Sequence, residues 1–560
     1  MLKKIIKTIG VLVLLLVVLI LGFFWNDAVS NKYEISIEDS KIPKFQTVAL
    51  NFNHQYNGDA SLPIAPSALI DIDNDNIDEV FFGGGMHQED AIFAYRDNKF
   101  VNISSEVNLP KKGLQVTTVG AVSADFDNNG FTDIIVGRED GLTIYYNFNG
   151  KFTAKKINTP INEKSTPAGL SVGDIDKDGD LDIFMATYLK KELMEGQTIF
   201  EDDTYGATSE LLLNTGNENY ISITKQAGLD YVHNTFQGVL VDIDNDSWLD
   251  LVVVHDTGEA RTYKNNGDLT YTMKPNPLTK KFAYPMGLAV GDYNNDGLVD
   301  FMFSNTGSTL PRIIAKGDIK DASLFNEKWI LFKNEGDFKF TDTAEETKIA
   351  DYEFSWGCTF ADMNNDGLQD LMVAENYVDF APNKLFRLPS RLLIQKDDGT
   401  FAPTEEESGV VNPHYAITSL VSDFNNDGYL DMIWVNINTP SLAYINKGGD
   451  NNYLQVDLGE SVNVQGAKVT VTTATKTLTE WLVTGEGLAS DQTALLQFGL
   501  GKETAVLSIK VVLANNQIIN VQNPEINTII NLKTEVKKHQ QTATDNTEQT
   551  AITDNVAVTK

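Results

Sequence analysis

The stretch GDIDKDGDLDIFMAT, residues 173–187, places five aspartates within nine positions and then continues into an apolar run. Its carboxylates stand at positions 1, 3, 5 and 9 of a loop that begins at Asp174 and has Gly179 at position 6. This spacing is typical of a calcium loop, in which alternate carboxylates point inward, a glycine permits a sharp turn and a backbone carbonyl, here near Asp180, completes the ligand set. The sequence therefore predicts a calcium site in this loop.

The same acidic loop occurs seven times along the chain, and an apolar run that reads as a buried strand follows each one. A single match would be weak evidence because acidic turns are common, but the repetition makes the pattern specific. The side chains expected to bind Ca²⁺ are, loop by loop, Asp71, Asp73, Asp75 and Glu79; Asp125, Asp127, Asn129 and Asp133; Asp174, Asp176, Asp178 and Asp182; Asp242, Asp244, Asp246 and Asp250; Asp292, Asn294, Asp296 and Asp300; Asp362, Asn364, Asp366 and Asp370; and Asp423, Asn425, Asp427 and Asp431.

The seven loops differ in their expected affinity for calcium. Loop three has four carboxylates and a glycine, so it should bind most tightly. A neutral amide oxygen gives up Coulomb attraction, so the loops in which asparagine replaces a carboxylate should bind more weakly. Loops one and four carry Asn76 and Ser247 at the glycine position, and asparagine tolerates the left-handed conformation better than serine.

Hairpin signatures alternate with the acidic loops. A turn rich in Asn, Asp and Gly joins two short β-prone segments, as in YKNNGDLTY at residues 263–271, and the seventh such hairpin is expected in INKGGDNNY at residues 445–453. Each repeat then holds about four strands, and a four-stranded unit repeated seven times is the signature of a β-propeller. EF-hands need flanking helices and a glutamate at position 12, where the third loop has Met185.

Charge and cysteine content narrow the class of protein. The 560 residues carry a formal net charge of −34, which argues against nucleic acid as a partner. The single cysteine, Cys358, excludes an intramolecular disulfide, and its place before an acidic loop predicts a small buried residue.

The N-terminus predicts a membrane anchor. Three lysines precede an uncharged apolar run over residues 8–25, which is near the lower limit for a membrane-spanning helix and would leave the N-terminus in the cytoplasm and the remainder exported. The competing interpretation is a cleavable signal peptide, with Ala28 and Ser30 as a small-residue cleavage site and a secreted product.

The loops, together with GAKVTV at residues 466–471, GEGLASDQ at 485–492 and FGLG at 498–501, resemble a known combination of domains. The loops look like the FG-GAP (VCBS-type) repeats of integrin-like seven-bladed propellers, and the C-terminal segments resemble the ASPIC/UnbV domain of the cartilage acidic protein family. The expected fold is all-β: an anchor over residues 1–30, a seven-bladed propeller over 45–450, a small β domain over 451–533 and a disordered tail over 534–560.

The resemblance implies an extracytoplasmic binding or adhesion module rather than an established catalytic activity. The alternative is an exported hydrolase or lyase that uses the propeller channel. GLSVG at residues 169–173 matches a nucleophile elbow, but it runs directly into the calcium loop and repeat five has alanine in place of Ser171. The six histidines show no short metal-binding spacing.

A ligand face is predicted opposite the calcium loops. The loops join first to second strands and the hairpins join third to fourth strands, so both lie on one face and the remaining connections lie on the other. Those connections are longest in repeats three, five and six, and a protein or glycan ligand is expected to bind there. The insertions carry Tyr188, Phe200, Tyr205, Phe325, Trp329, Tyr377, Phe380, Phe386, Arg387 and Arg391. The alternative is that the aromatic side chains pack the insertions onto the scaffold.

Overall fold

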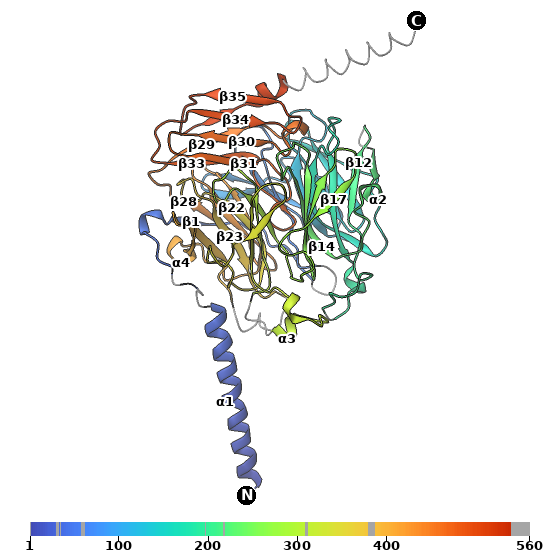
Figure 1. Ribbon diagram of the computed structural model, residues 1–560, viewed down its shortest axis with the longest axis vertical. Helices are drawn as coiled ribbons and strands as arrows, with labels where there is room; N and C mark the ends of the chain where they lie inside the picture. The colour runs from blue at the N-terminus through green and yellow to red at the C-terminus, as the bar shows by residue number, and fades with distance from the viewer. Residues whose placement is uncertain are drawn as a thin grey trace.

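The computed structural model describes residues 2–29, 33, 35–57, 62–196, 198–216, 219–307, 312–378 and 387–538. Helix α1 spans Leu2–Val29 and precedes an otherwise β-rich chain (Figure 1). Within these residues, no helix combines the length and the apolar character needed to cross a membrane. The structure thus gives no support to the predicted transmembrane anchor.

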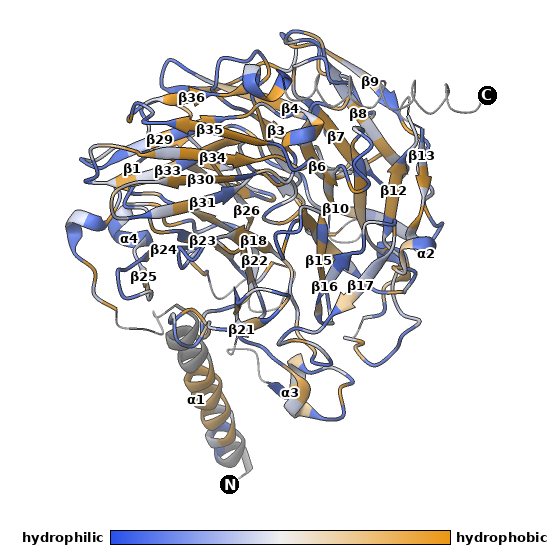
Figure 2. Cartoon of the chain, turned by 45° about the horizontal axis from the view of Figure 1, so that its top comes forward, coloured by the Kyte–Doolittle hydropathy of each residue, from blue (hydrophilic) through white to orange (hydrophobic). Residues whose placement is uncertain are grey.

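The repeats fold into seven antiparallel sheets within the described chain, numbered here one to seven after their loops. Sheets one to three contain β2 (Ser67–Ile70), β3 (Glu79–Phe82), β4 (Ala91–Arg96) and β5 (Lys99–Asn102); β6 (Thr118–Ala124), β7 (Asp133–Arg138), β8 (Gly141–Asn147) and β9 (Phe152–Lys156); and β10 (Ser165–Gly173), β11 (Asp182–Leu189), β12 (Glu210–Asn214) and β13 (Tyr220–Ser222). The strands are mostly hydrophobic and the connecting loops mostly hydrophilic (Figure 2).

The other four sheets repeat this plan. They contain β14 (Thr235–Val241), β15 (Asp250–His255), β16 (Ala260–Asn265) and β17 (Tyr271–Lys274); β18 (Leu288–Gly291), β19 (Asp300–Phe303), β20 (Ile330–Asn334) and β21 (Phe340–Asp342); β22 (Ser355–Ala361), β23 (Asp370–Glu375), β24 (Arg391–Gln395) and β25 (Phe401–Pro403); and β26 (Ala416–Ser422), β27 (Asp431–Asn436), β28 (Leu442–Asn446) and β1 (Phe45–Ala49). Short helices lie in the connections: η1 (Asp39–Lys41), η2 (Lys191–Leu193), α2 (Thr224–Ala227), α3 (Arg312–Ala315), η3 (Ala322–Leu324) and α4 (Glu405–Ser408).

The first strands of the sheets form a ring, which is the arrangement of a β-propeller. β2 neighbours β6, β6 neighbours β10, and β10 neighbours β14, while β18 neighbours β22, β22 neighbours β26 and β26 neighbours β2. Side chains of β14 and β18, such as Val241 and Val290, belong to one buried apolar cluster and join the two runs. All seven first strands are almost entirely buried, since they line the centre.

The seventh hairpin prediction is wrong. β28 pairs with β1 from the N-terminal part of the chain, with Phe45 opposite Asn446, rather than with the segment that follows it. That segment, β29 (Asn452–Asp457), pairs with C-terminal strands instead. A strand from the chain's beginning thus completes the last sheet and removes the open edge that a ring built from consecutive hairpins would leave.

The chain after β28 forms two further sheets with their own apolar core. They contain β33 (Leu495–Gly501), β29 and β36 (Ile529–Asn531), and β31 (Thr477–Trp481), β30 (Lys468–Thr472), β34 (Ser508–Val512) and β35 (Ile518–Gln522), with η5 (Val462–Val464) between β29 and β30. Residues 533–538 are helical and bury Val536 in this core, so the predicted disordered tail begins too early. The rest of that tail, residues 539–560, lies outside the described residues.

The segment over residues 484–492, called the plug here, extends from the C-terminal sheets into the centre of the ring. Its short strand β32 (Ser490–Asp491) pairs in parallel with β2. The Ser123 N–H donates to Asp491 Oδ2 at 2.7 Å, and the Val290 N–H donates to Glu486 Oε1 at 2.7 Å. An innermost strand presents unpaired backbone groups, so these side chains supply the acceptors that the ring itself lacks. The GEGLASDQ sequence is therefore explained by this contact.

Stability should depend on pH through the plug. Burial raises the pKa of Asp491 to about 7, above the value of about 4 expected for an unfolded aspartate. A group with a raised folded-state pKa stabilises the fold below its unfolded pKa, and that contribution is lost as pH rises through the folded value. Relative to Asp491→Asn, the wild type should lose roughly 1 to 3 kcal/mol between about pH 5 and about pH 8.

Urea unfolding of both proteins in saturating calcium measures this difference, because the variant retains every other titratable group. A constant difference in unfolding free energy across that range would contradict the assignment.

Two smaller predictions are confirmed. Cys358 is fully buried, and burial raises the pKa of its thiol. Ser171 lies in β10, is also fully buried, and its Oγ accepts the Leu240 N–H at 3.1 Å, so it is part of the packing between sheets three and four.

Candidate functional site

Each acidic loop joins the first and second strands of its sheet, as predicted. The residue at position 9 is the first residue of the second strand in all seven sheets, for example Asp133 in β7 and Asp182 in β11. A carboxylate at the start of a buried strand is held in a fixed place by the sheet, while the preceding eight residues turn above it. In each loop, the position-9 carboxylate is thus held by the sheet beneath the turn formed by positions 1 to 8.

Backbone donors fix the carboxylate at position 1. In loop three, Asp174 accepts the Asp178 N–H at 3.1 Å on Oδ1 and the Gly179 N–H at 3.1 Å on Oδ2. The equivalent bonds occur in the other six loops. These bonds set the loop's shape before any cation binds.

The carboxylates converge in the first four loops. Ligand atoms within each group lie within 4.8 Å of one another, close enough to share one ion. The groups are Asp71, Asp73 and Asp75; Asp125, Asp127 and Asp133; Asp174, Asp176 and Asp182; and Asp242, Asp244 and Asp246. Loops five to seven have asparagine at position 3, so an amide oxygen takes the place of one carboxylate there.

The electrostatics of the loops fit a bound cation. Burial raises the pKa of the position-9 carboxyl to about 8 for Asp133 and to about 9 for Asp300, even though backbone N–H groups donate to both. Neighbouring loop carboxylates raise these values further. A divalent cation favours the ionised form and offsets this repulsion, so the residues fit Ca²⁺ by donor type, number and charge.

Loop four already contains a protein cation. The Lys264 ammonium from β16 forms ion pairs with Asp244 and, at 2.6 Å, with Asp246. A calcium ion at this loop must displace that ammonium from the carboxylates at positions 3 and 5. We expect loop four to bind calcium more weakly than loop three for this reason, in addition to Ser247 at its glycine position.

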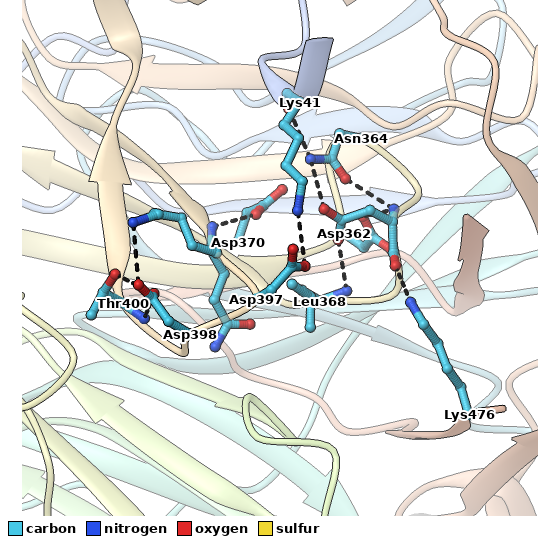
Figure 3. A network of polar contacts seen from close by, with 12 residues as sticks. Lys41, Asp362, Asn364, Leu368, Asp370, Asp397, Asp398, Thr400 and Lys476 are labelled. Atoms are coloured by element: carbon cyan, nitrogen blue, oxygen red, sulfur yellow. Dashed lines mark hydrogen bonds and ion pairs between the residues drawn. The ribbon is translucent and has the colours of Figure 1, made fainter. Parts of the chain in front are cut away.

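Loop six shows how an asparagine-containing loop is organised (Figure 3). Asn364 Oδ1 accepts the Asp366 N–H at 2.9 Å, while its Nδ2 donates to the Lys41 carbonyl at 2.9 Å. Asp370 accepts the N–H groups of Met363 and Gln395 at 3.0 and 2.9 Å. The amide therefore keeps its oxygen turned toward the loop, where a cation could use it.

Position 4 is a structural residue that the sequence reasoning missed. It has a positive φ in every loop, from 53° at Asn426 to 64° at Lys177, and it is asparagine in all loops except the third. Asn74 and Asn295 also donate to the position-6 carbonyl of the following loop, at 3.0 and 2.9 Å. The asparagine that recurs at position 4, between two predicted ligand positions, was the available signal.

A second missed residue lies where each third strand ends. Asn147, Asn265, Asn334 and Asn446 each donate their backbone N–H to the position-9 carboxylate of their own sheet and their side-chain amide to a loop carbonyl of an earlier sheet. Gln395 does the same in sheet six. This residue links neighbouring sheets, and its signal was the Asn that ends the third strand in five of the seven sheets.

Asn446→Ala should destabilise the protein by about 2 kcal/mol. Asn446 is buried, and its Nδ2 donates to the carbonyls of Met363 and Leu430 at 2.9 and 3.0 Å, which the variant would leave unpaired. Asn219→Ala removes an exposed amide from a hairpin turn and serves as the control. Urea unfolding of the two variants measures the costs, and equal costs would show that the link between sheets contributes little.

The C-terminal sheets lie over the loop face. Lys468 Nζ donates to the Gly297 carbonyl at 2.6 Å, and Gln497 Nε2 donates to Asn365 Oδ1 at 2.8 Å. The Thr132 hydroxyl of loop two donates to Glu460 Oε1 at 2.9 Å. In Figure 1 the strands β29, β30, β33, β34 and β35 accordingly lie together at one end of the molecule, and α3 lies at the other.

Comparison with known proteins agrees with this arrangement. A model described as FG-GAP-like repeat matches residues 125–185 and 242–303, which contain loops two to five, and one described as ASPIC and UnbV matches residues 459–539. Residues 459–539, which the second model matches, are called the ASPIC and UnbV region here. The expected resemblance to both is confirmed.

Two relatives resemble this chain at low identity over most of its length. Cartilage acidic protein 1 of Xenopus tropicalis is 24% identical over 506 residues, which cover 83% of this chain and 73% of the relative. The Homo sapiens protein of that name is 23% identical over 512 residues, covering 83% and 71%. Among solved structures, YCF48 bound to D1 peptide is 9% identical with a TM-score of 0.40, covering 72% of this chain and 99% of that one.

Opposite the FG-GAP loops, the predicted ligand-face residues are mostly buried. Tyr188, Phe200, Phe325, Trp329, Tyr377 and Arg391 are buried, Tyr205 is half-buried and Arg387 is exposed, while Phe380 and Phe386 lie outside the described residues. Arg391 pairs with Glu375 at 2.5 Å and Glu405 at 2.6 Å inside sheet six. These placements favour the alternative in which most of these side chains pack the insertions onto the FG-GAP repeats.

The insertions of repeats three and five pack against each other. The Phe200 N–H donates to Asp318 Oδ1 at 2.7 Å, and the rings of Phe200 and Phe325 lie 5.9 Å apart between centroids. Glu201 and Lys320 form an ion pair at 2.9 Å on the outside of this contact. Together the two insertions build a wall above sheet four, whose own connection is short. The wall encloses a cavity at this end of the ring.

Two histidines that are far apart in sequence, His233 and His255, lie in contact on the face with the insertions. The rings of His233 and His255 lie 4.3 Å apart, and the Tyr231 hydroxyl lies 3.0 Å from His255 Nε2. Burial lowers the pKa of His233 to about 4, and that of His255 lies further below its usual range because His233 adds to the effect. Both rings are therefore neutral and act in packing. Residues 22 positions apart in sequence gave no spacing signal for this pair.

Proposed function

We propose that this chain is an extracytoplasmic binding module of the adhesion type: a seven-bladed FG-GAP propeller over residues 45–450 and an ASPIC and UnbV domain over residues 451–533. Calcium in the acidic loops stabilises the propeller, and a protein or glycan ligand binds to the face opposite the loops. The relatives named cartilage acidic protein 1 support an extracellular role.

One observation carries this proposal. The ASPIC and UnbV region lies over the loop face and sends the plug into the ring, while the insertions enlarge the opposite face and enclose a cavity there. A ligand approaching the loop face would meet the ASPIC and UnbV region first, and a substrate in the channel would compete with the plug. The face with the insertions is the one that offers a recess.

The site can be tested with a protein and glycan array probed by full-length protein in calcium. Tyr205→Ala removes a half-buried aromatic ring that lines the cavity, and Phe148→Ala removes an exposed ring from a hairpin turn on the loop face. We expect the first variant to lose binding to the array ligand and the second to keep it. Retention by Tyr205→Ala together with loss by Phe148→Ala would place the ligand on the loop face.

A further inference from the structure

A cavity of about 300 Å³ lies between the insertions of repeats three and five and the ends of the inner strands. Its lining comes from segments far apart in the chain, including Tyr188 at the end of β11, Asp256 in the turn between β15 and β16, and Trp356 in β22. This volume is at the small end of the range for small-molecule sites. The cavity belongs to the ligand face proposed above, so the inference rests on that proposed function.

Six of the nineteen described residues that line the cavity are aromatic. Tyr188 packs on Phe236 with ring centroids 5.0 Å apart, and Phe354 packs on Trp356 at 5.6 Å. Tyr284 forms another wall, and its hydroxyl donates to the Ala315 carbonyl at 2.5 Å. Because Phe200 packs against Tyr284 from behind at 5.0 Å, that ring is held in place. These rings of the cavity wall are thus held in place by neighbouring aromatic side chains.

A carboxyl group lies among these rings. Asp256 Oδ2 accepts a hydrogen bond from the Tyr188 hydroxyl, which fixes the carboxyl at the cavity wall. Burial is the main cause that raises the pKa of Tyr188, Tyr205 and Tyr284, and the charge of Asp256 raises all three further. No arginine lines the cavity, and the charged side chains of its described lining are Asp256, Glu195 and Lys191, two carboxylates and one ammonium.

The turn that presents this carboxyl is strained. Thr257, which follows Asp256 and also lines the cavity, has a φ of 60°, a left-handed conformation that a β-branched residue rarely adopts. Across the cavity, the buried Thr306 hydroxyl has no hydrogen-bond partner among the described residues. Strained backbone and unused polar groups are typical of places where a ligand supplies the missing interaction.

We propose that this cavity binds an organic cation with an alkylammonium head, held by the Asp256 carboxylate and the surrounding aromatic faces. Aromatic faces attract cations, most strongly where water is excluded. An anion would meet the Asp256 carboxylate and a protein of net charge −34, whereas the same charge draws cations toward the site. A neutral ligand would leave the half-buried Asp256 carboxylate without a countercharge from the ligand.

Two sources carry this head group: a free small amine and a lysine side chain of a polypeptide. Isothermal titration of the full-length protein in saturating calcium separates them. The probes are choline and butylammonium as free amines, and a lysine flanked by two glycines on each side as the peptide. The neutral isostere 3,3-dimethylbutan-1-ol has the shape of choline without its charge, so it isolates the contribution of charge.

At least one of the cations should bind saturably, and the neutral isostere should bind at least roughly tenfold more weakly. Asp256→Asn keeps the shape of the side chain and removes its charge, so it should weaken cation binding by at least roughly tenfold. Glu201→Gln removes a carboxylate from the same insertion wall outside the cavity, and it should leave binding unchanged. Equal melting temperatures in calcium establish that both variants are folded.

The inference is overturned if no cation binds, if the neutral isostere binds as well as choline, or if Asp256→Asn binds the cations as the wild type does. Binding that Glu201→Gln weakens as much as Asp256→Asn would also overturn it, because general surface charge would then be the cause. The array experiment is independent: a ligand that needs Tyr205 but contains no amine would leave the proposed function standing while this inference fails.

Discussion

Removing calcium from the full-length protein should lower its melting temperature by roughly 10 °C or more. Each loop that binds calcium only in the folded state contributes about 2.7 kcal/mol when calcium is at 100 times its dissociation constant. Loops one to three each bring three carboxylates together, so more than one site should contribute. Without the ion, the buried carboxyls at position 9 remain either protonated or uncompensated.

A matched pair of substitutions separates calcium binding from general charge. Asp176→Asn alters position 3 of loop three, whose carboxylate is a predicted ligand. Asp180→Asn removes the same charge at position 7, where only the backbone carbonyl is expected to bind. Both side chains are half-buried, so they differ mainly in this role. Asp176→Asn should weaken calcium binding at loop three by roughly tenfold, and Asp180→Asn should change it little.

Differential scanning calorimetry with excess calcium and with excess chelator measures the first effect, and calcium titration of the two variants measures the second. Identical unfolding with and without calcium would show that the loops hold their shape by hydrogen bonds alone. Equal losses in the two variants would mean that the net charge of the loop, rather than coordination at position 3, governs binding.

The loops and strands could be predicted because their information is local. An aspartate at position 9 followed by an apolar run fixes where each second strand begins, and the seven repeats support one another. The register of the last sheet could not be predicted this way. β1 has an ordinary strand pattern at Phe45–Ala49, and its pairing with β28 is a contact across nearly 400 residues that no local signal specifies.

The predicted ligand face was harder to derive from the sequence because residue type does not show whether a side chain is buried or exposed. Aromatic residues suit both recognition surfaces and cores. Phe325 is buried because two insertions pack together, and Trp329 is buried against Tyr352. Asp256 gave no signal, since a single aspartate in a short turn is usually solvated. Its importance depends on the tyrosines that the ring brings around it.

Gly485→Ala should destabilise the protein by about 3 kcal/mol or more and loosen the ASPIC and UnbV region from the propeller. Gly485 has a φ of +86°, and a Cβ built there would lie 2.1 Å from the carbonyl oxygen of Leu170 in β10. The obstacle is backbone inside a sheet, so it cannot move aside as a flexible side chain could. The plug must shift away from the ring instead.

Withdrawal of the plug from the ring would break hydrogen bonds to several sheets at once. The Val172 N–H donates to Thr484 Oγ1 at 2.8 Å, and Gly487 exchanges two backbone hydrogen bonds with Leu288, at 2.8 and 3.0 Å. Each bond satisfies a backbone group of an innermost strand, and each would be lost without a replacement in a buried space. The loss of unfolding free energy in Gly485→Ala should therefore be larger than a single steric clash would cause.

Gly150→Ala is the matched control. Gly150 lies in the hairpin turn between β8 and β9 with a φ of +78°, and no atom lies within 4 Å of a Cβ built there. It shares the backbone strain of Gly485→Ala, about 1 kcal/mol, without the clash. Urea unfolding gives the two costs, and limited proteolysis within residues 482–493 reports exposure of the plug. If both variants cost the same and the plug stays protected, the close approach of Gly485 to Leu170 is not what holds the ASPIC and UnbV region on the ring.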